Sequence, residues 1–260
     1  MSAARARGAD VSEAALRTEG LSKSFGAFTA NDAVSFTLQR GARHALIGPN
    51  GAGKTTFVNL VTGRLVPSSG DVFLDGERVT LLPEHVRVRR GLTRTFQINT
   101  LFAGLSVFES VLLAVCQSRG HGGRWFSRLS RLDAEQRDVW ALLEQLRLRE
   151  DAAALTSNLP YGKRRLLELA LALAARPRIL VLDEPASGIP AAESREMFEV
   201  IAALPRDVTL LFIEHDMGLV FRFAERITVL VGGRILCEGA PAEISADARV
   251  REVYLGEGRE

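Results

Sequence analysis

The sequence has few of the features that mark secreted, zinc-binding or membrane-spanning proteins. Its 260 residues include two cysteines, Cys116 and Cys237, which lie far apart and form no CxxC pair. This spacing excludes a disulfide framework and a cysteine zinc site, and it favours a reducing compartment. The longest apolar run, 166–175, is interrupted by Glu168. It is far shorter than the ~20 residues that cross a bilayer.

The chain also lacks a strong charge bias. Net charge is +2, and the basic residues, mostly arginines, are scattered along the sequence. Nucleic-acid binding would require a basic tract or face. The first residues, MSAARARGADVSEAAL, contain no apolar segment typical of a secretory signal, so we expect a loose tail over 1–15. These absences predict a soluble protein with no nucleic-acid partner, which can still sit against a membrane protein.

The hydrophobic pattern alternates between strand-like and helix-like segments. Helices are expected at 54–62 and 193–204, and short apolar strands at 45–47, 179–182, 208–214 and 227–239. SSGDVFLDGERV (68–79) predicts an antiparallel hairpin around Asp-Gly. Strands that alternate with helices favour a mainly parallel α/β sheet. Residues 99–173 have helical spacing instead, with amphipathic segments at 101–115 and 133–148, and form an insertion.

A glycine-rich segment follows the first apolar strand. GPNGAGKTT fits the pattern G-x-x-x-x-G-K-[ST], in which the backbone N–H groups and the start of the next helix surround phosphates. The lysine neutralises the β- and γ-phosphates, and the first threonine can bind Mg²⁺. The predicted phosphate-binding residues are Gly48, Pro49, Asn50, Gly51, Ala52, Gly53, Lys54, Thr55 and Thr56.

Polar side chains end three other predicted segments. RILVLDEP places Asp183 at a strand end, where it can bind a metal, and Glu184 next to it, where it can serve as a base for water. LLFIEHDM places His215 at another strand end, where it can contact a γ-phosphate or orient water. RTFQ places Gln97 before the helical insertion, where it can reach metal or water. Each of these three motifs alone is weak evidence for a function. Together with the glycine-rich segment, and in this order, they predict phosphate hydrolysis.

The order GPNGAGKTT, RTFQ, LPYGKRR, ILVLDEP, IEHD resembles that of the ATP-binding cassette ATPases, the motor subunits of ABC transporters. The resemblance covers about 16–255. RTFQ, the LPYG form, IEHDM and the ending VREVYLGEG are similar to the first ATPase subunit of branched-chain amino acid importers, the LivG type. A lipopolysaccharide-export motor is also similar, but the LPYG loop and an insertion at 116–131 fit it less well.

The resemblance implies a P-loop NTPase fold with an antiparallel β subdomain and an inserted helical subdomain. It implies a nucleotide-binding core over 16–97 and 176–240, a helical subdomain over 98–175 and a helical extension over 241–260. Phe25 matches the aromatic residue that stacks on adenine. Gln97 matches the magnesium-sensing glutamine, Asp183 and Glu184 the Walker B pair, and His215 the switch histidine.

The resemblance also places a signature segment, LSGGQ in most members, at the start of a long helix. In the family, this segment covers the γ-phosphate bound to a second ATPase domain, arranged head to tail. The matching residues are Leu159, Pro160, Tyr161, Gly162 and Lys163. Pro160 replaces a serine, and loses a hydroxyl and a backbone N–H donor. Lys163 and Arg164 could add positive charge near a phosphate, whereas the alternative is that the segment only packs the helix start.

A second departure is SGIP (187–190), which lacks the D-loop aspartate of many members and contains Pro190. Both departures suit a heterodimer with two different sites, and a homodimer remains open. The implied cofactors are ATP and Mg²⁺. The implied partners are a second ATPase subunit, two permease subunits and, indirectly, a periplasmic binding protein, at the cytoplasmic face of the bacterial inner membrane. A non-transport cassette and a nucleotide-binding regulator without hydrolysis are the alternatives.

Overall fold

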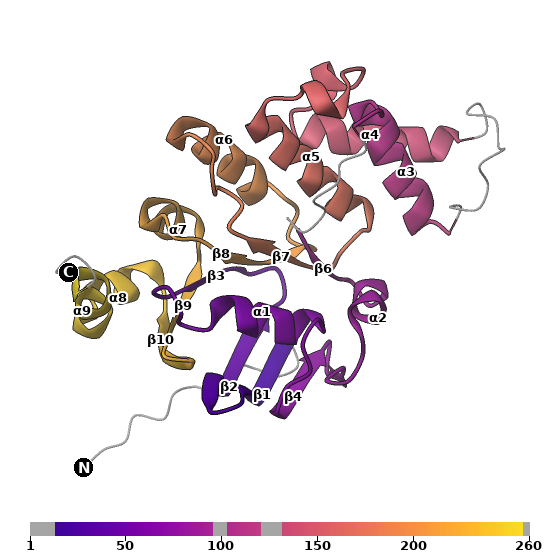
Figure 1. Ribbon diagram of the computed structural model, residues 1–260. Coiled ribbons are helices and arrows are strands. Elements are labelled where there is room, and N and C mark those ends of the chain that lie inside the picture. The colour runs from indigo at the N-terminus through magenta and orange to yellow at the C-terminus, as the bar shows by residue number, and fades with distance from the viewer. Residues whose placement is uncertain (1–13, 96–102, 121–131, 257–260) are drawn as a thin grey trace, which may run out of the picture.

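Two β-sheets organise the computed structural model, which describes residues 14–95, 103–120 and 132–256 (Figure 1). The larger sheet has six strands in the order β10-β9-β3-β8-β7-β6. These strands are β3 (Arg43–Ile47), β6 (Leu92–Arg94), β7 (Ile179–Asp183), β8 (Thr209–Ile213), β9 (Arg226–Val231) and β10 (Arg234–Gly239). Strands β6, β7, β8, β3 and β9 pair in parallel, and β10 pairs antiparallel with β9 after the Gly232-Gly233 turn. The predicted mainly parallel sheet is confirmed.

The smaller sheet is antiparallel, with the order β2-β1-β4-β5. It contains β1 (Ala14–Phe25), β2 (Phe28–Gln39), β4 (Ser69–Leu74) and β5 (Glu77–Arg78). The predicted hairpin at Asp75-Gly76 is therefore confirmed. The tail expected over 1–15 is wrong at its end, because Ala14 and Ala15 are buried and lie in β1, where Ala14 pairs with Gln39.

The larger sheet is buried on both faces, as a parallel sheet must be. Side chains alternate along β7, so that Ile179 and Val181 pack with helix α1 (Lys54–Thr62) and the smaller sheet. Leu180 and Leu182 pack on the opposite face, in the cluster formed by the other helices. These helices include α5 (Tyr161–Ala174), α6 (Ala191–Ala202) and α7 (Met217–Phe223). Figure 1 shows α1 between the two sheets.

Three helices pack against one another beyond the larger sheet: α3 (Val107–Ser118), α4 (Asp133–Gln145) and α5. Helix α3 begins later than the predicted segment 101–115, because Ser106 caps it: the Ser106 hydroxyl accepts from the Glu109 N–H, and the Glu109 carboxylate accepts from the Ser106 N–H. Most apolar side chains of α3 are buried, including Val107, Val111 and Val115. They belong to the core shared with α4 and α5.

The remaining helices are short and lie at the edges of the sheets. They are α2 (Glu84–Arg89), α8 (Pro241–Ala246) and α9 (Ala248–Gly256), together with 3₁₀ turns at Arg149–Asp151 and Thr156–Asn158. Helix α8 packs against β9 and β10, and α9 against α8. Within the described residues, none of the helices is long and apolar enough to span a membrane.

Candidate active site

The loop between β3 and α1 forms a cradle of backbone N–H groups. Gly48 has φ 155° and Gly53 has φ 97°. A Cβ on Gly48 would lie 2.1 Å from the Leu230 carbonyl oxygen, and a Cβ on Gly53 would lie 2.3 Å from that of Ala30. Only glycine fits such close backbone approaches. The first turn of α1 has no side-chain cap and no acidic residue, so its N–H groups and its positive end can receive an anion.

Two of the predicted phosphate-binding side chains lie at the start of α1. Lys54 is buried, and its Nζ donates to the carbonyl oxygens of Gly48 (2.6 Å) and Pro49 (2.9 Å). The ammonium group therefore lies against the backbone at the start of the loop. Thr55 is exposed, which leaves its hydroxyl accessible for a metal ion.

The cradle is held from outside by residues that the sequence did not identify. Asn31 of β2 is fully buried, and its Nδ2 donates to the Gly53 carbonyl at 3.3 Å. The Gly233 N–H, in the β9–β10 turn, donates to the Ala52 carbonyl at 3.0 Å. Asn31 lies in β2, which contains no recognisable sequence motif, so nothing in the sequence was a reason to select this residue.

Parallel pairing brings the predicted acidic and histidine residues to the edge where the cradle begins. Asp183 ends β7 and pairs with Ile213, the last residue of β8. On its other side, Ile213 pairs with Leu46 of β3, one residue before that strand ends. Because the carboxyl ends of parallel strands share one edge, Asp183, Glu184 and His215 all follow that edge. The structure therefore places the side chains of two motifs that lie far apart in sequence beside the cradle.

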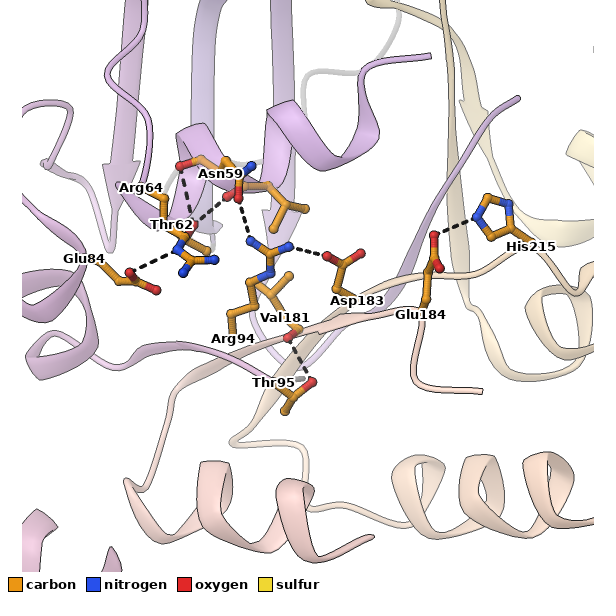
Figure 2. A network of polar contacts seen from close by, with 11 residues as sticks. Asn59, Thr62, Arg64, Glu84, Arg94, Thr95, Val181, Asp183, Glu184 and His215 are labelled. Carbon is orange, nitrogen blue, oxygen red and sulfur yellow. Dashed lines mark hydrogen bonds and ion pairs between the residues drawn. The ribbon is translucent and has the colours of Figure 1, made fainter. Parts of the chain in front are cut away.

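Glu184 and His215 form a direct pair. Glu184 Oε1 lies 2.7 Å from His215 Nε2, and both side chains are about half exposed (Figure 2). Glu184 has φ 51°, a left-handed conformation that is uncommon for a residue with a side chain. Its N–H still donates to the Ile213 carbonyl at 3.0 Å, which fixes this turn to β8. A carboxylate and an imidazole in contact at a strand edge can accept, hold and return a proton.

A third carboxylate, Glu214, lies beneath this pair and was missed from the sequence. It is 5% exposed and accepts from the N–H groups of Ala186 (2.8 Å) and His215 (3.2 Å). Burial raises the pKa of Glu214, and the neighbouring Glu184 raises it further, while the two backbone N–H groups lower it. Glu214 thus links the turn after Glu184 to the backbone of His215.

A second missed residue is Arg94, the first residue of RTFQ. Its guanidinium donates to Oδ2 of Asp183 and, at 2.6 Å, to Oδ1 of Asn59 on α1 (Figure 2). RTFQ was read for its glutamine, and nothing in the sequence indicated that the arginine would reach a residue 89 positions away. Gln97 itself lies outside the described residues.

The predicted signature segment starts α5 and lies beside α6. Pro160 is the N-cap residue and provides no side-chain cap. The Tyr161 hydroxyl donates to the Ser187 carbonyl at 3.3 Å, within the SGIP segment. A Cβ on Gly162 would lie 2.4 Å from Glu193 Oε2 on α6, so a carboxylate sits close to this helix start.

The two cationic side chains expected at the signature segment both donate to nearby acceptors. Lys163 Nζ donates to both carboxylate oxygens of Asp151 at 2.7 Å. Arg164 donates to the carbonyl oxygens of Leu159 (2.8 Å) and Ser157 (2.6 Å). Asp151 thus balances the charge of Lys163, whereas the acceptors of Arg164 are neutral carbonyl oxygens and leave its charge in place. That these two residues add positive charge near a phosphate of a second subunit stays a prediction.

The expected adenine-stacking residue lies at the tip of the β1–β2 hairpin. Phe25 is 49% exposed and pairs across the hairpin with Phe28, which is 63% exposed. The Lys23 ammonium lies 5.3 Å from the centroid of the Phe25 ring. Two exposed aromatic rings at one tip are unusual unless a partner or ligand covers them, and the sequence identified only one of them.

Fold and site together define a P-loop ATPase, and sequence similarity places it in a family. Residues 31–187 match the ABC transporter family, so the chain belongs to this family. Members bind nucleotide and hydrolyse ATP to power transport. Residues 234–260 match a second family, the branched-chain amino acid ATP-binding cassette transporter.

Individual relatives cover nearly the whole chain. It is 38% identical to the high-affinity branched-chain amino acid transport ATP-binding protein BraF of Pseudomonas aeruginosa, over 93% of this chain and 98% of BraF. It is 39% identical to LivG of Salmonella typhimurium, over 95% and 100%. The lipopolysaccharide export system ATP-binding protein LptB of Escherichia coli is 34% identical over 94% and 98%. The ADP conformation of an ATP-binding cassette superposes with a TM-score of 0.81 at 27% identity, covering 94% of this chain and 99% of that one.

Proposed function

We propose that the chain is the ATP-hydrolysing subunit of an importer for branched-chain or related amino acids. The relatives with higher identity are ATP-binding proteins of branched-chain amino acid transport. The carboxyl-terminal match, which includes β10, supports the same group. Export of lipopolysaccharide is the alternative, and it is less favoured because the export relative is less similar. The cargo is chosen by other subunits, so related amino acids, amides or urea stay open.

The residues at the strand edge fit ATP with Mg²⁺. The cradle of residues 48–53 and the first turn of α1 offer N–H groups and the Lys54 ammonium to phosphates. The Thr55 hydroxyl and the Asp183 carboxylate are hard oxygen donors, which Mg²⁺ prefers. Within the described residues, no cluster of three or more His, Cys, Asp or Glu side chains could hold a metal alone. That fits Mg²⁺, which is usually held by one or two side chains together with phosphates and water.

The pair Glu184–His215 is the observation that carries hydrolysis. We infer that Glu184 takes the proton of the attacking water and that His215 holds Glu184 in position. Gln97 would complete the metal and water contacts, and Phe25 would stack on adenine. The signature residues Leu159–Lys163 would act on the nucleotide of a second ATPase subunit. Partner subunits would be that ATPase, as heterodimer or homodimer, and two permeases at the cytoplasmic face of the membrane.

The test is Glu184→Gln, with Glu196→Gln as the matched control on the exposed side of α6. General-base loss should lower ATP turnover by about 10²- to 10⁴-fold. ATP binding, measured by nucleotide fluorescence, should stay unchanged in both variants. If Glu184→Gln kept its turnover, the assignment of the base would be wrong.

Light scattering of Glu184→Gln with Mg-ATP then tests assembly. A dimer that forms only with ATP would support a homodimer with a working LPYGK segment. An ATP-bound monomer would indicate that a different ATPase subunit is required. Reconstitution with amino-acid importer permeases should raise turnover when the amino-acid-binding protein is added. Stimulation by lipopolysaccharide export subunits instead would refute the importer assignment.

A further inference from the structure

Arg94 joins the two elements that carry the proposed magnesium ligands. It ends β6, next to β7 in the sheet, and its side chain is 4% exposed. Nη2 donates to Oδ2 of Asp183, the last residue of β7, and Nη1 donates to Oδ1 of Asn59 in α1 at 2.6 Å (Figure 2). One planar guanidinium therefore fixes the distance between a strand end and the helix that follows the phosphate cradle.

The bridge lies close to the position where a metal ion would be bound. Asn59 is four residues after Thr55, so the two side chains share one face of α1, one turn apart. Arg94 uses Oδ2 of Asp183 and leaves Oδ1 without a donor among the described residues. A carboxylate held through one oxygen keeps the other available for a metal ion or for a metal-bound water.

The hydrogen bonds of Arg94 do not satisfy its whole guanidinium group, which argues against a purely structural role. Its Nε is buried and has no acceptor among the described residues. A buried N–H without an acceptor lowers stability. A position selected only for core stability would be better served by an apolar side chain, since buried ion pairs are often replaceable in that way.

We propose that Arg94 is a positioning residue for the magnesium site, which orients Asp183 toward the metal while Asn59 anchors the guanidinium to α1. This inference rests on the proposed function, because it requires Asp183 to serve Mg²⁺. The opposite reading is that Arg94 competes with the cation for Asp183 and repels it. The two readings predict opposite changes in metal affinity when the guanidinium is removed.

The test measures metal affinity without turnover. Mn²⁺ replaces Mg²⁺ as the probe, and its bound form is read by electron paramagnetic resonance in the complex of the chain with a non-hydrolysable ATP analogue. Arg94→Met should weaken Mn²⁺ binding by about 10- to 100-fold, the range seen for residues that orient metal ligands. Affinity for the analogue in EDTA should stay within about twofold, since a loss through unfolding would lower both quantities.

Two further variants separate positioning from charge. Asn59→Ala keeps the Arg94 charge but removes its anchor, and should also weaken Mn²⁺ binding, by less than Arg94→Met. Arg90→Met removes the same charge from the surface, where Arg90 pairs with Glu77 at 2.5 Å, and should leave Mn²⁺ affinity unchanged. If Arg94→Met does not fold, Asn59→Ala alone still decides.

The outcomes are distinct. Unchanged Mn²⁺ affinity in Arg94→Met and Asn59→Ala would overturn the proposal. Tighter binding in Arg94→Met would overturn it in favour of competition. Absence of a bound Mn²⁺ signal in the wild-type chain would instead refute the magnesium site and with it the proposed function.

Discussion

A buried histidine in β3 should make the stability of this protein depend on pH. His44 is 1% exposed and packs edge-on against Phe36, with ring centroids 4.9 Å apart. Its Nε2 lies 2.8 Å from Thr228 Oγ1, and the Thr228 hydroxyl donates to Glu238 at 3.0 Å. Because Thr228 gives its proton to Glu238, His44 Nε2 must donate, which leaves the neutral ring with its proton on Nε2.

Burial lowers the pKa of His44 to about 4 from its usual 6.5, although Glu238 opposes the shift. The unfolded chain thus takes up a proton near pH 6.5, and the folded chain only near pH 4. Between these values the unfolded state binds more protons, so stability falls as pH falls. For these two pKa values, single-site linkage gives a loss of about 2 kcal/mol between pH 7 and pH 5, and about 3 kcal/mol by pH 4.

The assay is urea unfolding at pH 7, 6 and 5 for the wild type and His44→Gln. Glutamine can donate to Thr228 but cannot be protonated, so the variant should lose about 2 kcal/mol less than the wild type over this range. Other titrating groups are common to both proteins and cancel in the difference. His85→Gln, at an exposed position of α2, should follow the wild type. Equal losses in wild type and His44→Gln would refute the reasoning.

Two further predictions concern a buried arginine and the aromatic hairpin tip. Arg87→Met should lower the free energy of unfolding in urea by about 3 kcal/mol, because the buried guanidinium donates to four main-chain carbonyls, two of them at the end of α1. The exposed Arg89→Met should change it by less than about 0.5 kcal/mol, and equal losses would contradict this account. Phe25→Ala should weaken ATP binding about tenfold in a fluorescence titration, as loss of one stacked ring does, whereas Phe28→Ala should not. A loss in Phe28→Ala alone would transfer the stacking role to Phe28.

Much of the larger sheet could be predicted because its strands are short apolar runs that end in distinctive residues. The segment 179–182 was identified as a strand, and the structure extends it by one residue, to Asp183. Helix 54–62 was predicted with its observed bounds, since glycine precedes and follows it. The start of α3 was placed too early, because apolar residues before Ser106 continue the helical spacing and the capping box was overlooked.

The site was predictable where a motif holds its own residues together, or where polar residues end parallel strands that share one edge. The cradle of residues 48–53 is such a case, because its conformation depends on adjacent glycines. The contact between Asn31 and the Gly53 carbonyl depends instead on how the smaller sheet sits against α1. Likewise, the sequence did not reveal the contact between Lys163 and Asp151, since nothing in it indicates that the 3₁₀ turn holding Asp151 folds back onto α5.

The three carboxylates at the strand edge show why these long-range contacts matter for function. Asp183 ends β7, Glu184 follows it, and Glu214 follows the neighbouring strand β8. Carboxylates this close repel one another unless other groups stabilise their charges. The structure gives each a different partner: Arg94 for Asp183, His215 for Glu184, and main-chain N–H groups for Glu214. These contacts differ in kind: Asp183 accepts from a guanidinium, Glu184 contacts an imidazole, and Glu214 accepts from the main chain. If Asp183 serves Mg²⁺ and Glu184 serves water, as we propose, their separate roles would follow from these different partners, of which Arg94 and His215 come from other strand ends.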